Sequence, residues 1–196
     1  VDGSAAARLM VHRSFGTWEG EFTPDSQWLI FRSDEIGHSA IRARRLTGDT
    51  TTIPVVVDQS SDTQIALSPD GRWLAYSSDR SGENEIYITP FPSLAFTRLV
   101  SRDDGTEPRW SRNGRELFFR SSDWLTSVPV TPGPSLVLGS PRRLFDVSQY
   151  RSARNRQEYD VAPDGQHFVM IRNRPPTDQL IYVENWFPEL LAKARR

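Results

Sequence analysis

Acidic and amide side chains recur at a fixed spacing before four similar turns, and they are the best candidates in this sequence for binding a ligand or a cation. The turns begin at Thr23, Ser68, Ser111 and Ala162. Four residues before each turn stand Glu19, Gln64, Glu107 and Glu158, and two residues before it stand Glu21, Ala66, Arg109 and Asp160. Strand side chains alternate between two faces, so both sets are predicted to share one face. Convergent carboxylates bind hard cations such as Ca²⁺. The alternative is that these are solvated or salt-bridged side chains, with Arg109 as a counter-charge.

Other reactive constellations are missing from the sequence. The chain has no cysteine, which excludes a disulfide, a thiolate nucleophile and a cysteine zinc site. It has no Gly-x-Ser-x-Gly nucleophile motif and no glycine-rich phosphate loop. His12, His38 and His167 fit no metal-binding spacing. The net charge of -1 gives no general attraction to nucleic acid, and no apolar run approaches the ~20 residues that span a bilayer. These observations favour a binding module over an enzyme.

The turns themselves mark an internal repeat. The second residues of the four turns are at positions 24, 69, 112 and 163, so the repeat advances by 45, 43 and then 51 residues. Pro, Asp or Asn, and Gly suit the successive positions of a tight turn, and apolar strand-like runs flank each turn. Four antiparallel strands at this period are typical of a β-propeller blade. The basic run from Arg151 to Arg156 falls in the longest step, and we expect it to be an inserted surface loop.

The predicted fold is therefore all-β, a propeller of four repeat blades in one domain or half-propeller spanning residues 1–196. The expected blades cover residues 18–58, 62–101, 106–147 and 157–184. A strand at 8–13 is expected to complete the last blade, and a short helix is expected at 186–194. The ring can close within one chain, between two chains, or as the tail of a larger propeller. We expect a homodimer, because an isolated half-ring exposes apolar blade faces.

Three segments resemble the repeats of TolB-type, WD-like propellers: SPDGRWLAYSSDRSGENEIYITPF, EPRWSRNGRELFFRS and YDVAPDGQHFVMIR. The third turn departs from the pattern with Arg112 in place of Pro, and the first has Ser26 in place of Gly. The strand Arg142–Asp146 and the tail Asn185–Leu190 also resemble the C-terminal propeller of bacterial membrane-anchored serine/threonine kinases. The Ser78–Gly82 box belongs to the repeat pattern, and we expect it to tie neighbouring blades together.

The resemblance implies a non-catalytic binding or sensing module, or a protein-interaction module, within a larger bacterial protein. An extracytoplasmic location, periplasmic or at the cell surface, and a protein, peptide or glycan ligand are expected. The alternative is a fragment of a propeller-bearing peptidase, or a hydrolase that uses a cation bound in the channel. No other cofactor is expected, and neither a nucleic-acid partner nor a membrane segment is expected within this chain.

Overall fold

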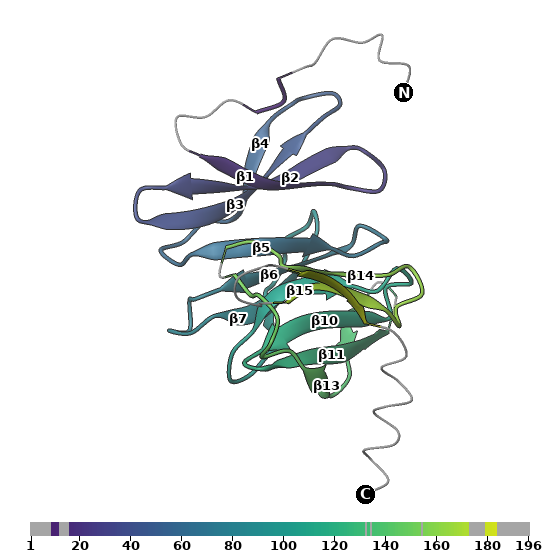
Figure 1. Ribbon diagram of the computed structural model, residues 1–196. Helices are drawn as coiled ribbons and strands as arrows, with labels where there is room; N and C mark the ends of the chain where they lie inside the picture. The colour runs from purple at the N-terminus through teal and green to yellow at the C-terminus, as the bar shows by residue number, and fades with distance from the viewer. Residues whose placement is uncertain are drawn as a thin grey trace, which may run out of the picture.

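The chain folds into four consecutive antiparallel sheets. The computed structural model describes residues 9–11, 16–131, 133, 135–153, 155–172 and, for the backbone only, 179–183. Within those residues the sheets contain four, four, five and three strands in chain order. Figure 1 shows the first sheet at the top, the second below it and the third at the bottom. The prediction of an all-β fold built from four repeat blades is confirmed.

Each sheet is a meander of strands that follow one another in sequence. The first contains β1 (Thr17–Phe22), β2 (Trp28–Glu35), β3 (His38–Arg45) and β4 (Thr52–Val56). The second contains β5 (Asp62–Leu67), β6 (Trp73–Ser78), β7 (Glu85–Pro90) and β8 (Arg98–Leu99). The third contains β9 (Thr106–Trp110), β10 (Glu116–Ser121), β11 (Trp124–Thr131), β12 (Val137–Leu138) and β13 (Arg142–Asp146), and both β12 and β13 pair with β11. The fourth contains β14 (Tyr159–Val161), β15 (Phe168–Arg172) and β16 (Gln179–Val183).

The repeated turn joins the first two strands of every sheet by the expected chemistry. In the second sheet, the Ser68 hydroxyl donates to Asp70 Oδ1 at 2.6 Å and accepts from the Trp73 backbone N–H at 2.9 Å. Gly71 adopts a φ of 73°, a left-handed conformation that favours glycine. The turn therefore fixes the register of β5 against β6 from local sequence alone.

Apolar clusters fill the spaces between neighbouring sheets. Ile30 and Ile41 of the first sheet pack with Leu74 and Tyr76 of the second. A second cluster joins sheets two and three, and a third joins sheets three and four. In the third cluster, the rings of Phe118 and Phe168 meet edge to face with their centroids 5.1 Å apart. Each fully buried large side chain of this kind contributes roughly 1.5–3 kcal/mol to folding, so the stacking of sheets is the main source of stability.

Two expectations at the ends of the chain fall mostly outside the described residues. Of the strand expected at 8–13, the structure describes only Leu9, Met10 and Val11, and these belong to no strand. The helix expected at 186–194 lies entirely outside the described residues. Where the structure is described, it contains no helix long and apolar enough to cross a membrane.

Candidate functional site

The side chains four residues before each turn connect one blade to the next. Both carboxylate oxygens of Glu19 accept from the second blade, Oε1 from Gln64 N at 3.2 Å and Oε2 from Ile65 N at 3.0 Å. Gln64 Oε1 in turn accepts from Glu107 N at 3.0 Å, and Glu107 Oε2 accepts from Glu158 N at 2.6 Å. The same contact therefore repeats at three successive junctions, and we call it the inter-blade relay.

A β-bulge aims these relay side chains. Glu19, Gln64 and Glu107 have φ values of 42°, 56° and 55°, and the pairing of β1, β5 and β9 with the next strand shifts at these positions. A bulge interrupts strand alternation. Even so, Glu19 contacts Arg32, and Glu21 pairs with Ile30 on the same face of β2. In the third blade, Glu107 contacts Arg120, and Arg109 pairs with Phe118 on the same face of β10. The prediction that the two sets share one face therefore holds in these two blades despite the bulge.

Burial raises the pKa of the Glu19 and Glu107 carboxyl groups. Arginines of the second strands oppose this effect. The guanidinium of Arg32 lies 2.9 Å from Glu19 Oε1, and that of Arg120 lies 3.1 Å from Glu107 Oε1. Hydrogen bonds from backbone N–H groups also lower the pKa of both carboxyl groups. Both carboxylates thus have ion-pair and backbone partners within the protein.

The residues two before each turn follow no common pattern. Glu21 Oε2 accepts from Leu67 N at 2.9 Å, and burial raises the Glu21 pKa. Arg109 Nε donates to Tyr159 O at 3.3 Å and lies 3.8 Å from Asp160, whose side chain is exposed. Among the described residues, no three His, Cys, Asp or Glu side chains lie close enough together to hold a metal ion. The proposed channel Ca²⁺ therefore has no complete ligand set in this part of the chain.

The basic run lies on the surface, as expected, and makes hydrogen bonds to the first three blades. Arg32 donates to Asn155 O at 2.7 Å, Gln64 Nε2 donates to Ala153 O at 2.6 Å, and Arg120 donates to Arg151 O at 2.6 Å. These three donors belong to blades one, two and three. We call residues 151–157, apart from Arg154, the crossing segment.

The crossing segment lies at the surface, with Ser152, Asn155 and Arg156 exposed, and its backbone supplies acceptors to buried donors. Arg32, Gln64 and Arg120 are 4%, 0% and 3% exposed, and a buried donor without an acceptor is costly. Gln157 adds bonds of its own, donating to Ile65 O at 3.1 Å and to Pro108 O at 3.0 Å. The prediction of a surface loop is confirmed, and these hydrogen bonds are a role that the sequence did not indicate. The available sequence signal was an arginine directly after the apolar run of the second strand, at Arg32 and again at Arg120.

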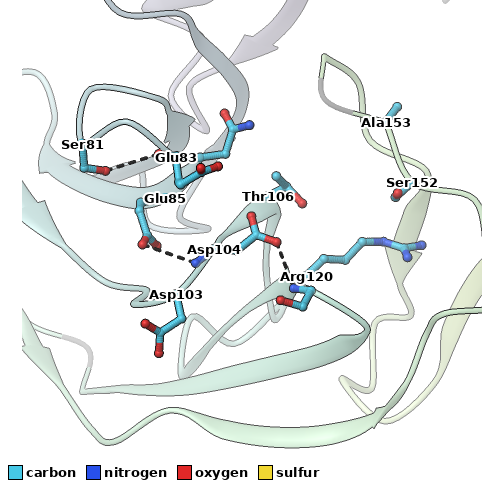
Figure 2. Close-up of a pocket in the computed structure, with 11 residues that line it drawn as sticks. Ser81, Glu83, Glu85, Asp103, Asp104, Thr106, Arg120, Ser152 and Ala153 are labelled. Carbon is cyan, nitrogen blue, oxygen red and sulfur yellow. Dashed lines mark hydrogen bonds between the residues drawn. The ribbon is translucent and has the colours of Figure 1, made fainter.

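A polar pocket of about 820 Å³ lies beside the crossing segment, between the second and third blades. Figure 2 shows Glu85, Asp103 and Asp104 on one side and Arg120, Ser152 and Ala153 toward the other. Glu83 also lines the pocket. The sequence analysis did not select these acidic residues, because β7 and the loop before β9 come together only in the folded blade.

The acidic side of the pocket is held by hydrogen bonds. Glu85 is buried and accepts from the Ser101 hydroxyl and from Asp104 N. Asp104 Oδ2 accepts from Ser122 N at 3.0 Å, a bond drawn in Figure 2. Asp103 and Asp104 have φ values of 71° and 99°. The loop is thus fixed by contacts to β7 and to the turn after β10, while Glu83 and Asp103 stay exposed.

Comparison with known proteins identifies the architecture. No protein-family model matches the chain, and no curated protein sequence is significantly similar to it. Solved structures do match. TolB from Acinetobacter baumannii superposes with a TM-score of 0.66 at 17% identity, over 89% of this chain and 42% of that one. The fold is that of a TolB-like and WD-like β-propeller.

Two further solved structures align over the same share of this chain. The Cps50 (Swd1) β-propeller domain of Myceliophteria thermophila matches with a TM-score of 0.63 at 13% identity, over 89% of this chain and 59% of that one. An oligogalacturonate lyase in complex with manganese matches with a TM-score of 0.65 at 14% identity, over 89% and 50%. The chain thus spans about half the length of these proteins, and at such low identity the likeness shows the fold alone.

Proposed function

We propose that this propeller is a non-catalytic binding module that recognises a protein or peptide ligand through a basic side chain. The observation that carries the proposal is the acidic pocket between blades two and three. Its lining includes four carboxylates, those of Glu83, Glu85, Asp103 and Asp104, and one arginine. That arginine, Arg120, already forms an ion pair with Glu107. The pocket is therefore complementary to a cationic group.

The pocket also offers preorganised acceptors. Asp104 is anchored to Ser122 and Glu85, so the loop loses little conformational freedom when a ligand binds. The exposed carboxylates of Glu83 and Asp103 then remain for a lysine or arginine of the ligand. A charged group at the centre of a concave polar site fixes the orientation of its ligand.

The proposal also covers the cellular location of the module and the larger protein that contains it. The resemblance of the repeats supports an extracytoplasmic domain of a larger bacterial TolB-like or kinase-associated protein. No observation in the described residues favours the alternative of a peptidase fragment or a cation-dependent channel hydrolase. A glycan ligand would rely on the hydroxyl and amide groups of the pocket instead of its charge.

Defined peptides test the proposal. Tripeptides with a central lysine or arginine and blocked ends, added to the ¹⁵N-labelled chain, should shift amide signals at Asp103, Asp104, Ser122 and Ser152. The same peptide with a central glutamate should not. The substitution Asp103→Asn removes a charge but keeps a side chain that tolerates positive φ, and it should weaken binding. Asp49→Asn, at an exposed site outside the pocket, is the matched control. Equal shifts with basic and acidic peptides, or shifts spread away from the pocket, would refute the proposal.

A further inference from the structure

A second, smaller pocket adjoins the acidic pocket, and Asp103 and Ser122 line both. It has a volume of about 270 Å³ and lies between the loop that joins β8 to β9 and the strands of blade three. Its other lining residues come from that loop, from β10, β11 and β13, and from the residue before β13: Arg102, Phe119, Ser121, Thr126, Arg143 and Pro141. We call it the basic pocket, because its charged side chains are two arginines and one aspartate.

Neither arginine of the basic pocket has an acidic partner among the described residues. The nearby Arg120, in contrast, forms an ion pair with Glu107. The guanidinium of Arg143 lies over the ring of Trp124, 5.6 Å from its centroid. This contact attracts the guanidinium and limits its movement, but it does not neutralise the charge. The positive charges of Arg102 and Arg143 therefore remain for a ligand.

Thr126 adds a hydroxyl group that lacks a hydrogen-bond partner. The residue is 4% exposed, and its Oγ1 has no partner in the part of the chain that is described. Thr126 pairs with Phe119 of β10 on one side and with Arg143 of β13 on the other, so it lies between two other residues of the pocket lining. A buried hydroxyl without a partner is unfavourable. An acceptor atom bound in the basic pocket would supply the partner that this hydroxyl lacks.

Two guanidinium groups and a hydroxyl offer more donors than a carboxylate can use. A carboxylate has two oxygens and one negative charge, and a single guanidinium can satisfy both oxygens through two parallel hydrogen bonds. A phosphate monoester has three terminal oxygens and a charge of about −1.5 to −2 at pH 7. It can accept from Arg102, Arg143 and Thr126 together. We propose that the basic pocket is a binding site for a phosphate group.

Phosphate titrations of the ¹⁵N-labelled full chain at pH 7.5 and constant ionic strength test the proposal. Inorganic phosphate should give saturable shifts of the Arg102, Thr126 and Arg143 amide signals. Acetate should bind at least about 10-fold more weakly, because it lacks the third oxygen and the second charge. A blocked phosphoserine is the second phosphate probe. Tighter binding of this ester would assign the site to a phosphorylated side chain, and tighter binding of inorganic phosphate would assign it to the free ion; both results support the proposal.

Thr126→Val separates ligand binding from stability. The substitution keeps nearly the same shape and removes a hydroxyl with no partner, so the free energy of unfolding should not fall. Phosphate binding should weaken at least about 5-fold. Ser127→Ala is the matched control. Ser127 is also buried with an unpartnered hydroxyl, but it follows Thr126 directly in β11 and so lies on the opposite face. The control should bind phosphate as the wild type does.

The contribution of the arginines is tested by Arg143→Gln. This variant should bind phosphate at least about 10-fold more weakly than the wild type. Arg112→Gln, at an exposed site in the turn after β9, controls for the loss of one positive charge and should bind normally. Amide spectra of each variant show whether it is folded.

Asp103 distinguishes this proposal from the peptide-binding proposal, because it lines both pockets. Asp103→Asn should weaken binding of the lysine peptide, and it should strengthen phosphate binding because a like charge is removed. Arg143→Gln should leave binding of the lysine peptide unchanged. Each proposal can therefore fail without the other.

Three results would overturn the phosphate proposal. The first is the absence of saturable shifts at Thr126 and Arg143 with both phosphate probes. The second is binding of acetate as tight as that of phosphate. The third is phosphate binding that Thr126→Val and Arg143→Gln leave as strong as Ser127→Ala and Arg112→Gln do.

Discussion

Asp62 provides the sharpest prediction about stability, because the protein buries its carboxylate completely at the start of β5. Oδ1 accepts from the Ser60 hydroxyl at 3.2 Å and lies 3.6 Å from Arg80 Nη2. Within the part of the chain that is described, Oδ2 has no hydrogen-bond partner. Burial, together with the nearby carboxylate of Asp58, raises the Asp62 pKa from 3.8 to about 6, and Ser78, Arg80 and Ser60 oppose the change.

The sign of the pH dependence follows from this raised pKa. The folded state holds the Asp62 proton more tightly than the unfolded chain, so the stabilising contribution is complete below about pH 4 and is lost as the pH rises through 6. At about 1.4 kcal/mol per pKa unit, the loss is about 3 kcal/mol. Asp62→Asn removes this titration while preserving the shape of the side chain.

Urea unfolding of the wild type and of Asp62→Asn at several pH values between 3.5 and 7 measures the effect. The free energy of unfolding of the wild type, minus that of the variant, should fall by about 3 kcal/mol over this range. Asp49→Asn, at an exposed carboxylate, controls for the general effect of losing one charge. A difference between wild type and Asp62→Asn that stays constant with pH would refute the argument.

Three other substitutions test contacts between and within blades by the free energy of unfolding. Gln64→Ala leaves the Glu107 N–H and two crossing-segment carbonyls unpaired, and should destabilise the fold by about 2–4 kcal/mol in a urea titration. Trp110→Phe removes the indole N–H that donates to Ala66 O at 3.0 Å, and should cost about 1–3 kcal/mol by thermal unfolding, whereas no loss would mean that this bond is dispensable. Tyr159→Phe removes a buried hydroxyl with no hydrogen-bond partner among the described residues, so calorimetry should find it neutral or stabilising; a loss above about 1 kcal/mol would reveal an unseen partner.

The blade repeat could be predicted from sequence because its signals are local. The Ser68–Gly71 turn carries its own hydrogen-bonding chemistry, and the alternating runs on either side need only pair across it. The same chemistry recurs where Asn113 replaces Asp in the third turn, with the Ser111 hydroxyl donating to Asn113 Oδ1 at 2.9 Å. Four copies of one local pattern were enough to indicate the fold.

The contacts of the inner-strand side chains with the next blade could not be predicted in this way. Counting back from the turn found Glu19, Gln64 and Glu107 as an equivalent set, but a bulge at each position turns the side chain toward the next blade. Whether a strand contains a bulge depends on the N–H donors of another blade, 43 to 51 residues further along the chain.

The crossing segment and the pocket depend on still longer separations. Arg32 meets Asn155 across 123 positions in the chain, and Gln64 meets Arg156 across 92. No periodicity in a single sequence encodes such pairs. The useful local sign was an arginine directly after the apolar run of a strand, at Arg32 and Arg120, and such a residue indicates a partner without naming it.

Amide hydrogen exchange tests most directly the claim that the relay residues join blades. In the wild type, the Glu107 and Glu158 N–H groups should exchange as slowly as the most protected core strands, since each donates to a buried side chain of the preceding blade. In Glu107→Ala, protection at Glu158 and Ala153 should fall while protection at Glu107 itself is retained. Rapid exchange at these amides in the wild type, or protection at Glu158 that is unchanged in the variant, would contradict the account.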